Sequence, residues 1–155
     1  MTTEAVQSRS TALLARIHAL WTVLESLVPL WIILLASRVA VGAVFFRSGL
    51  LKTDNWPLTL LLFRDEYKVP LLSHELAAMV ATGVELSMPV LLFAGLLSRL
   101  AALPLLGMTL VIQIFVYPNA WSEHLLWATL LVIVFTRGPG MLSLDRLLGI
   151  ERRSP

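Results

Sequence analysis

An apolar stretch at about residues 28–51 is long enough to cross a lipid bilayer, yet it carries Arg38 near its middle. A helix needs about 20 apolar residues to cross the hydrocarbon core. An arginine at that depth costs at least about 2.5–3.5 kcal/mol to insert, so we expect its side chain to face the protein interior and meet a partner there. Gly42 and Gly49 in the same stretch allow another helix to approach closely. The stretch therefore predicts one span of a packed helical membrane protein.

Composition extends this interpretation to the whole chain. With 57% hydrophobic and 14% charged residues over 155 positions, the chain is too apolar for a soluble surface and has the length of one domain. The net charge of +2 comes from basic residues that mostly flank apolar runs, so we expect membrane topology and no nucleic-acid partner. The chain has no cysteine. This excludes a thiol–disulfide relay or thiolate metal site within it, so any redox chemistry needs a bound cofactor or a partner.

Three more apolar stretches, at about residues 73–97, 100–117 and 121–137, predict further membrane helices. The expected fold is all-α, with a four-helix transmembrane bundle over residues 28–140. Residues 1–27 repeat apolar side chains at three- and four-residue spacing, which predicts an amphipathic helix lying on the membrane or beneath the bundle. Residues 141–155 are expected to form a cytoplasmic basic tail.

Residues 52–73 join the first two spans and contain an apolar run, residues 58–63, that is too short to cross a bilayer. We therefore expect an interfacial or re-entrant segment that covers the mouth of the bundle. At its end Ser73 precedes the second span and Glu75 falls in the first turn of that span, a pattern typical of a helix N-terminus.

The basic residues predict the orientation of the chain in the membrane. Lys52, Arg64 and Lys68 lie in the first loop. The side of the two termini holds seven arginines, Arg9, Arg16, Arg99, Arg137, Arg146, Arg152 and Arg153. Because positive charge accumulates on the cytoplasmic side, both termini are expected in the cytoplasm, with the first loop on the outer face, which is periplasmic if the source is a Gram-negative bacterium.

Arg38 and Glu85 are the predicted hub of the bundle. Counted from the ends of their spans, both residues lie roughly 15 Å deep, so we expect them to be in contact. The pair could be a functional site that binds an anionic or quinone-like head group or relays a proton, which makes both residues candidate catalytic residues. It could equally be a structural ion pair that fixes the helix register. Gln113 could extend this polar path or bond a kinked backbone.

Two histidines open helices on the expected outer face. His74 precedes Glu75, and His124 follows Glu123. Histidines from two helices could ligate a haem or a copper or zinc ion, with the carboxylates as further ligands. The alternative is that the carboxylates stabilise helix N-termini and that nearby aromatic residues form an interfacial belt.

A series of residues runs along the chain in a definite order and spacing: Arg38, Gly42, Phe45, Ser48, Gly49, Lys52, Phe63, Tyr67, Pro70, Ala77, Glu85, Pro89, Gly95, Arg99, Trp121, His124, Trp127, Gly138, Ser143 and Asp145. In this order and spacing the residues resemble the DoxX family of small bacterial membrane proteins. The resemblance implies a four-helix membrane bundle and an association with membrane oxidoreductase complexes or with oxidative-stress and metal-linked gene clusters. Its matching candidate site positions are Arg38, Lys52, Glu85, Trp121, His124 and Asp145.

Two functions follow as alternatives. The chain could be the membrane subunit of a bacterial oxidoreductase that holds a quinone within the bundle, with a protein partner supplying electrons. The candidate cofactor-binding residues are Arg38, Lys52, Gln113, Tyr117 and Trp121. Otherwise the chain is a non-catalytic scaffold, a transporter or a metal-handling component that works with a periplasmic partner. In either case we expect contact with lipid and either a partner subunit or a homo-oligomer.

Overall fold

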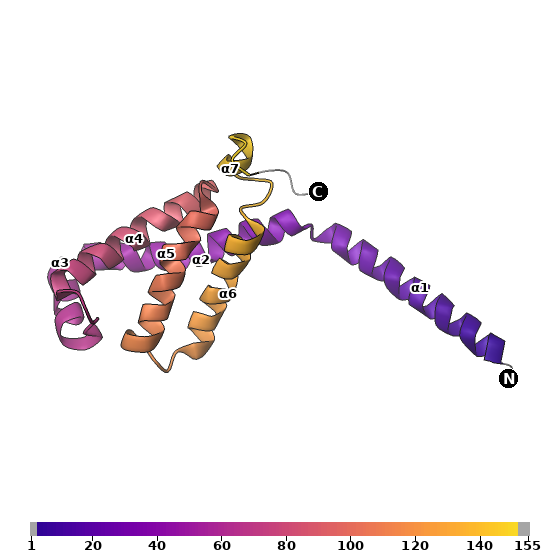
Figure 1. Cartoon of the computed structure of the whole chain (residues 1–155), viewed down its shortest axis with the longest axis horizontal. Coiled ribbons are helices and arrows are strands. Elements are labelled where there is room, and N and C mark those ends of the chain that lie inside the picture. Colours follow the sequence, from indigo (N-terminus) through magenta and orange to yellow (C-terminus); the bar gives the residue numbers. More distant parts are fainter. Residues whose placement is uncertain (1–2, 152–155) are drawn as a thin grey trace. The chain divides into compact units, whose positions relative to one another are not determined.

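The structure, a computed structural model, describes residues 3–151, with side chains from Leu13 onward. It divides into two compact units, Met1–Ile33 and Leu34–Pro155. The first unit is dominated by α1 (Thr3–Leu27), drawn in indigo in Figure 1. Its helical conformation agrees with the helix predicted for residues 1–27. Apolar side chains of α1 such as Leu20 and Trp21 are exposed, and their contact with the membrane stays a prediction.

The second unit, as far as residue 151, consists of helices joined by short loops. It contains most of α2 (Leu30–Asp54), followed by a short helix and a π-helical turn, α3 (Trp56–Leu62) and η1 (Phe63–Tyr67). The remaining elements are α4 (His74–Ala94), α5 (Ser98–Val111), the π-helical turn η2 (Ile112–Val116), α6 (Trp121–Arg137) and α7 (Leu144–Leu147). No strand occurs in residues 3–151, so the all-α prediction is confirmed for this part of the chain.

Three helical segments are long and apolar enough to cross a membrane: α2, α4 and the continuous segment Ser98–Val116 formed by α5 and η2. These segments imply contact with the lipid bilayer. The fourth predicted span coincides with α6, which has 17 residues. At 1.5 Å per residue that is about 26 Å, at the lower limit for a spanning helix. Its formation as a helix is confirmed, and its crossing of the bilayer stays a prediction.

Local sequence signals set the limits of α4. The Ser73 hydroxyl accepts a hydrogen bond from the Leu76 amide at 3.3 Å, which confirms the predicted N-terminal cap. At the other end Gly95 adopts φ +66°, a left-handed conformation that glycine tolerates and that ends the helix. The segment between α2 and α4 is folded into α3 and η1. Asn55 caps α3 by accepting from the Leu58 amide at 3.1 Å.

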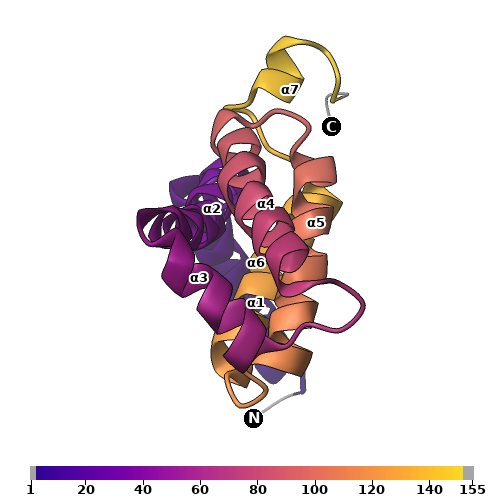
Figure 2. The same ribbon diagram turned by 90° about the vertical axis from the view of Figure 1, so that its left-hand side faces the viewer.

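The apolar core joins four helices. Its fully buried members are Val41 and Phe45 from α2, Leu92 from α4, Ala101, Ala102 and Leu105 from α5, and Leu131 and Val134 from α6. Helix α5 contacts both α4 and α6, and Figure 2 shows α4 and α5 side by side with α7 beyond one end of them. The alanines on α5 keep these helices close, since a small side chain lets backbones approach.

Glycines on α2 decide how α2 meets α4. A Cβ on Gly42 would lie 2.6 Å from the Phe93 ring, and a Cβ on Gly49 would lie 2.9 Å from Leu86 and 3.0 Å from Glu85 Cβ. These distances are too short for an added side chain, so α4 packs its side chains directly onto α2 at both glycines, as predicted for this face of α2. The two contacts also show that α2 and α4 run antiparallel, since the later residue of α2 meets the earlier residue of α4.

The Gly49 contact predicts a stability effect. Gly49→Leu should lower the free energy of unfolding by about 1–3 kcal/mol, because the new side chain overpacks the α2–α4 contact. Gly107→Leu on α5 is the matched control, since nothing lies within 4 Å of a Cβ at that position. Thermal denaturation in detergent measures both. Equal losses in the two variants would contradict a close α2–α4 contact at Gly49.

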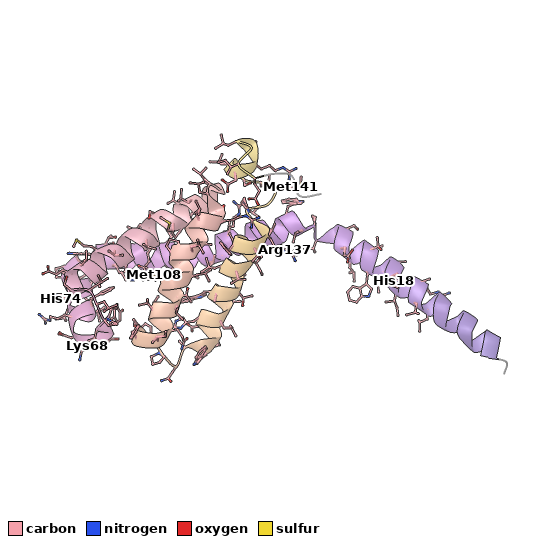
Figure 3. The ribbon with its side chains drawn as sticks, viewed as in Figure 1. His18, Lys68, His74, Met108, Arg137 and Met141 are labelled. Carbon is pink, nitrogen blue, oxygen red and sulfur yellow. The ribbon has the colours of Figure 1, made fainter. Side chains whose placement is uncertain are left out.

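The second prediction concerns orientation in the membrane. Figure 3 places Lys68 and His74 at one end of the second unit and Arg137 and Met141 at the other. A reporter that is active only outside the cytoplasm should be inactive when fused after Glu151 and active when inserted at Asp65, because the end carrying Arg99, Arg137 and Arg146 is richer in positive charge. The reverse activities would overturn this orientation.

Candidate functional site

A cavity of about 440 Å³ lies between α2, α4 and α5, with η1 forming part of its wall. Most of its lining is apolar, including Phe45, Val84, Met108 and Trp127. Five polar or ionisable residues also line it, Ser48, Lys52, Tyr67, Glu85 and Tyr117. Small-molecule sites commonly have this size and this mixture of an apolar wall with a few polar groups. The cavity is therefore the candidate functional site.

The charged group in the cavity is an ion pair between Lys52 and Glu85. Lys52 Nζ donates to Glu85 Oε1 at 2.9 Å and lies 2.8 Å from Oε2. It also donates to Ser48 Oγ at 2.9 Å, and the Ser48 hydroxyl donates to Glu85 Oε1 at 3.2 Å. Oε2 has no aligned hydrogen-bond donor, so its charge is balanced by the nearby ammonium ion alone. The Glu85 side chain is 3% exposed and that of Lys52 16%, so the pair is desolvated and partly open toward the cavity.

Helix geometry explains this triad. Ser48 and Lys52 are four residues apart on α2 and therefore share one face. Gly49 lies between them in sequence and has no side chain, so Glu85 on α4 can pack against this part of α2. The Lys52 ammonium offsets the penalty of burying the Glu85 carboxylate, which would otherwise be several kcal/mol.

Two tyrosines form a second polar group on the cavity wall. Tyr67 is the last residue of η1, and Tyr117 follows η2. Their hydroxyl oxygens are 3.4 Å apart, and their rings meet edge to face with centroids 6.0 Å apart. Burial raises the pKa of the Tyr67 phenol, and its hydrogen bond to Tyr117 raises it further. Tyr67 therefore stays protonated and neutral at physiological pH.

The predicted contact between Arg38 and Glu85 is wrong. Arg38 is fully buried, and it donates from Nη1 to the Leu92 carbonyl at 3.2 Å and from Nη2 to the Leu142 carbonyl at 2.6 Å. The depth estimate counted residues from the ends of the two spans, whereas the register is set by the packing of Gly42 and Gly49 on α4. That register puts Arg38 near the C-terminal end of α4. Lys52, 14 positions further along α2 and hence about 21 Å away, meets Glu85 instead.

Arg38 belongs to a structural cluster around the turn between α4 and α5. A Cβ on Gly95 would collide with Arg38 Nη1, so glycine at this turn leaves room for the guanidinium. The Asp145 carboxylate accepts hydrogen bonds from the backbone amides of Leu97 at 2.7 Å and Ser98 at 3.1 Å. Asp145 thereby caps the N-terminus of α5, where a negative charge is favourable. Both side chains hold the turn, and neither lines the cavity.

Gln113 and His124 form a separate buried pair. Gln113 Nε2 donates to the Pro118 carbonyl at 2.7 Å, which turns its Oε1 toward His124 Nδ1 at 2.6 Å. His124 Nδ1 must therefore carry the hydrogen in this bond. Of the two roles considered for Gln113, bonding to the backbone near η2 is the one that this geometry favours. The pair lies next to Trp127, whose ring centroid is 5.0 Å from the ring centroid of His124.

The remaining predicted site residues are more scattered. Trp121 is 66% exposed and is not among the residues lining the cavity. His74 begins α4, at the same end as Lys68 (Figure 3). The described residues contain no group of three or more His, Asp or Glu placed to hold a metal. Haem, copper or zinc at His74 and His124 stays a prediction, with one nitrogen of His124 already bonded to Gln113.

The structure thus brings together Lys52, Glu85 and Tyr117 from the predicted set and adds Ser48 and Tyr67. Ser48 was detectable in the sequence because it lies one helical turn before Lys52. Tyr67 was one of the spaced positions that carried the family resemblance, but nothing in its local sequence placed it opposite Tyr117.

A double-mutant cycle tests the ion pair. Lys52→Met leaves Glu85 buried without a counter-charge and should destabilise the protein by about 3–5 kcal/mol. The double variant Lys52→Met with Glu85→Gln should lose less than the sum of the two single losses, because the two residues interact directly. Thermal denaturation in detergent gives each value. The matched cycle with Arg38→Met and Glu85→Gln should be additive within about 0.5 kcal/mol; strong coupling there would restore the Arg38–Glu85 contact.

Comparison with known proteins agrees with this architecture. The DoxX family model matches residues 33–118, a range that includes Ser48, Lys52, Tyr67, Glu85 and Tyr117. An uncharacterized protein of Haemophilus influenzae is 33% identical over 130 residues, covering 74% of this chain and 82% of that protein. No solved structure matches the chain. The resemblance noted in the sequence is therefore confirmed: the chain belongs to the DoxX family.

Proposed function

We propose that this DoxX-family membrane protein is the membrane subunit of a bacterial oxidoreductase system and binds a quinone in the cavity lined by Lys52, Glu85 and Tyr117. The observation that supports the proposal best is the composition of the cavity, about 440 Å³ of mainly apolar wall with two groups of polar atoms. A quinone combines an apolar ring and tail with carbonyl oxygens that accept hydrogen bonds, so its chemistry is complementary to such a wall.

The charge of the site favours a neutral ligand. The Lys52 ammonium and the Glu85 carboxylate balance each other at 2.8–2.9 Å, so the cavity offers little net attraction to an anion. An anionic ligand would also have to lose its hydration on entering an apolar space, which is unfavourable without an unpaired counter-charge. An uncharged acceptor such as a quinone carbonyl avoids both penalties.

Lys52 is the residue best suited to hold that acceptor. An ammonium group has three N–H donors, and the bonds to Glu85 and Ser48 occupy two of them. The third donor is available to a ligand oxygen. Glu85 keeps the ammonium in place and offers a carboxylate that can accept or release a proton beside the bound ring. Aromatic side chains of the wall, Phe45, Phe63 and Trp127, provide surfaces on which a planar ring can pack.

The proposal includes a partner and a location. Because the chain lacks cysteine, electrons would reach the ligand from a partner subunit or a second bound cofactor. The proposed location is the bacterial inner membrane, and the distribution of basic residues supports an orientation with both termini in the cytoplasm. In this arrangement α6 would be the fourth span of the bundle, and the segment formed by α3 and η1 would lie at the outer membrane interface.

Quinone content tests the proposal directly. Protein purified from bacterial membranes should carry quinone that organic extraction and chromatography detect. Lys52→Met with Glu85→Gln removes the charged donor while leaving no unpaired charge. It should reduce the quinone-to-protein ratio at limiting quinone, with affinity falling roughly 10–100-fold, the value of a hydrogen bond to a charged group.

Lys68→Met is the control, since it removes a lysine that follows η1 and does not line the cavity. It should retain quinone. An unchanged quinone affinity in the double variant would contradict the proposal. So would the absence of any quinone binding by the folded wild-type protein, an outcome that favours a non-catalytic scaffold. A haem or metal that co-purifies and is lost with His124→Ala would move the site to the outer rim.

A further inference from the structure

The tyrosine pair stands where two π-helical turns meet. η1 carries Tyr67 at its end, η2 is followed directly by Tyr117, and the two turns contact each other. A π-helical turn is a rare conformation that often occurs at functional sites. Both turns contribute to the wall of the cavity, and each places its tyrosine there. The two tyrosines are therefore placed on the cavity wall by the local helix geometry, and the proposed function has given them no role so far.

The hydrogen bonding of the pair is incomplete. Each phenol has one hydrogen, and only one of the two can lie between the oxygens. That contact is long, with 3.4 Å between the Tyr67 and Tyr117 oxygens, and neither hydroxyl makes another hydrogen bond within residues 13–151. One phenolic hydrogen is consequently free to be donated to a further acceptor, and both residues line the cavity.

The protonation of Tyr67 determines what that acceptor can be. Burial is the main cause that raises its pKa, with further contributions from Tyr117, Glu66 and Glu85. A phenol that stays neutral donates a hydrogen bond and does not attract a cation as a phenolate would. The complementary ligand group is therefore a hydrogen-bond acceptor and not a cation, and the balanced charge of the Lys52–Glu85 pair favours an uncharged one.

The cavity thus has two donor groups on different elements. Lys52 and Ser48 on α2 form the first together with Glu85 on α4, and the tyrosines after η1 and η2 form the second. We propose that the Tyr67–Tyr117 pair binds a second ligand oxygen, so that the site selects a molecule with two acceptor oxygens on an apolar ring over a lipid with a single polar end. This inference rests on the proposed function, because it assigns the far oxygen of a para-quinone to the tyrosines.

Removing the hydroxyls tests the assignment without removing the rings. Tyr67→Phe, Tyr117→Phe and the double variant would be titrated in detergent by calorimetry with two ligands. One is a short-chain para-quinone, and the other is an aryl ketone with the same alkyl tail and one oxygen. The double variant should bind the quinone about fivefold to tenfold more weakly, the effect of losing one neutral hydrogen bond. Its affinity for the ketone should change by less than about twofold, because the single oxygen is held at Lys52.

Thr109→Val supplies the matched control. It deletes a buried hydroxyl on α5 that bonds only the Leu105 carbonyl and does not line the cavity, and quinone affinity should stay at the wild-type value. If the double tyrosine variant loses affinity for the quinone and for the ketone equally, the proposed hydrogen bond from the tyrosines to a second ligand oxygen would be overturned. The tyrosines would then affect binding through the shape of the cavity. If the double tyrosine variant keeps the wild-type quinone affinity while Lys52→Met with Glu85→Gln loses affinity, this inference alone would be overturned. No quinone binding by the wild-type protein would overturn the proposed function and this inference together.

Discussion

The antiparallel packing of α2 against α4 is the contact on which the rest of this structure depends. Gly42 and Gly49 leave space on α2 that the side chains of Phe93 and Leu86 on α4 occupy. This packing fixes the register between the helices, and the register decides which buried charges meet. The Lys52–Glu85 pair and the position of Arg38 both follow from it.

Buried charge is used differently at the two ends of the second unit. Around the α4–α5 turn, Arg38 donates to backbone carbonyls and Asp145 accepts from backbone amides, so these residues satisfy chain ends that would otherwise remain unbonded. At the other end, Lys52 and Glu85 satisfy each other beside a cavity. In the first arrangement the hydrogen bonds go to backbone groups away from the cavity, and the buried Arg38 Nε is left without one. The second leaves a donor next to open space, which is the condition for recognising a ligand.

The cavity itself depends on segments that leave ordinary α-helical geometry. η1 and η2 each interrupt the regular hydrogen-bond pattern at the same end of the unit, and residues 68–73 then return the chain to α4 with Lys68 and Leu71 in left-handed conformations. Non-glycine residues rarely adopt such conformations, because they are strained by about 1–3 kcal/mol. The apolar core formed by Leu92, Leu105 and Leu131 supplies a rigid base against which this end is held.

The sequence by itself determined the class, the family and nearly all the helices. Apolar length identified the membrane segments, Ser73 marked the start of α4, and the limits of α6 at residues 121 and 137 were predicted correctly. These features depend on neighbouring residues and can be recognised locally. Lys52, Glu85 and Tyr117 were also singled out as site residues.

Only the tertiary structure decided which of these residues meet. Arg38 and Lys52 are both basic and both on α2, so charge could not say which one Glu85 would contact; the register set by the glycines did. Tyr67 and Tyr117 are fifty residues apart and meet because two π-helical turns bring them together. Side-chain periodicity records neither the register between two helices nor a change of helical geometry within one. A contact between distant segments is determined by packing over their whole length. Such a contact can be seen in the folded structure and not in the sequence of either segment.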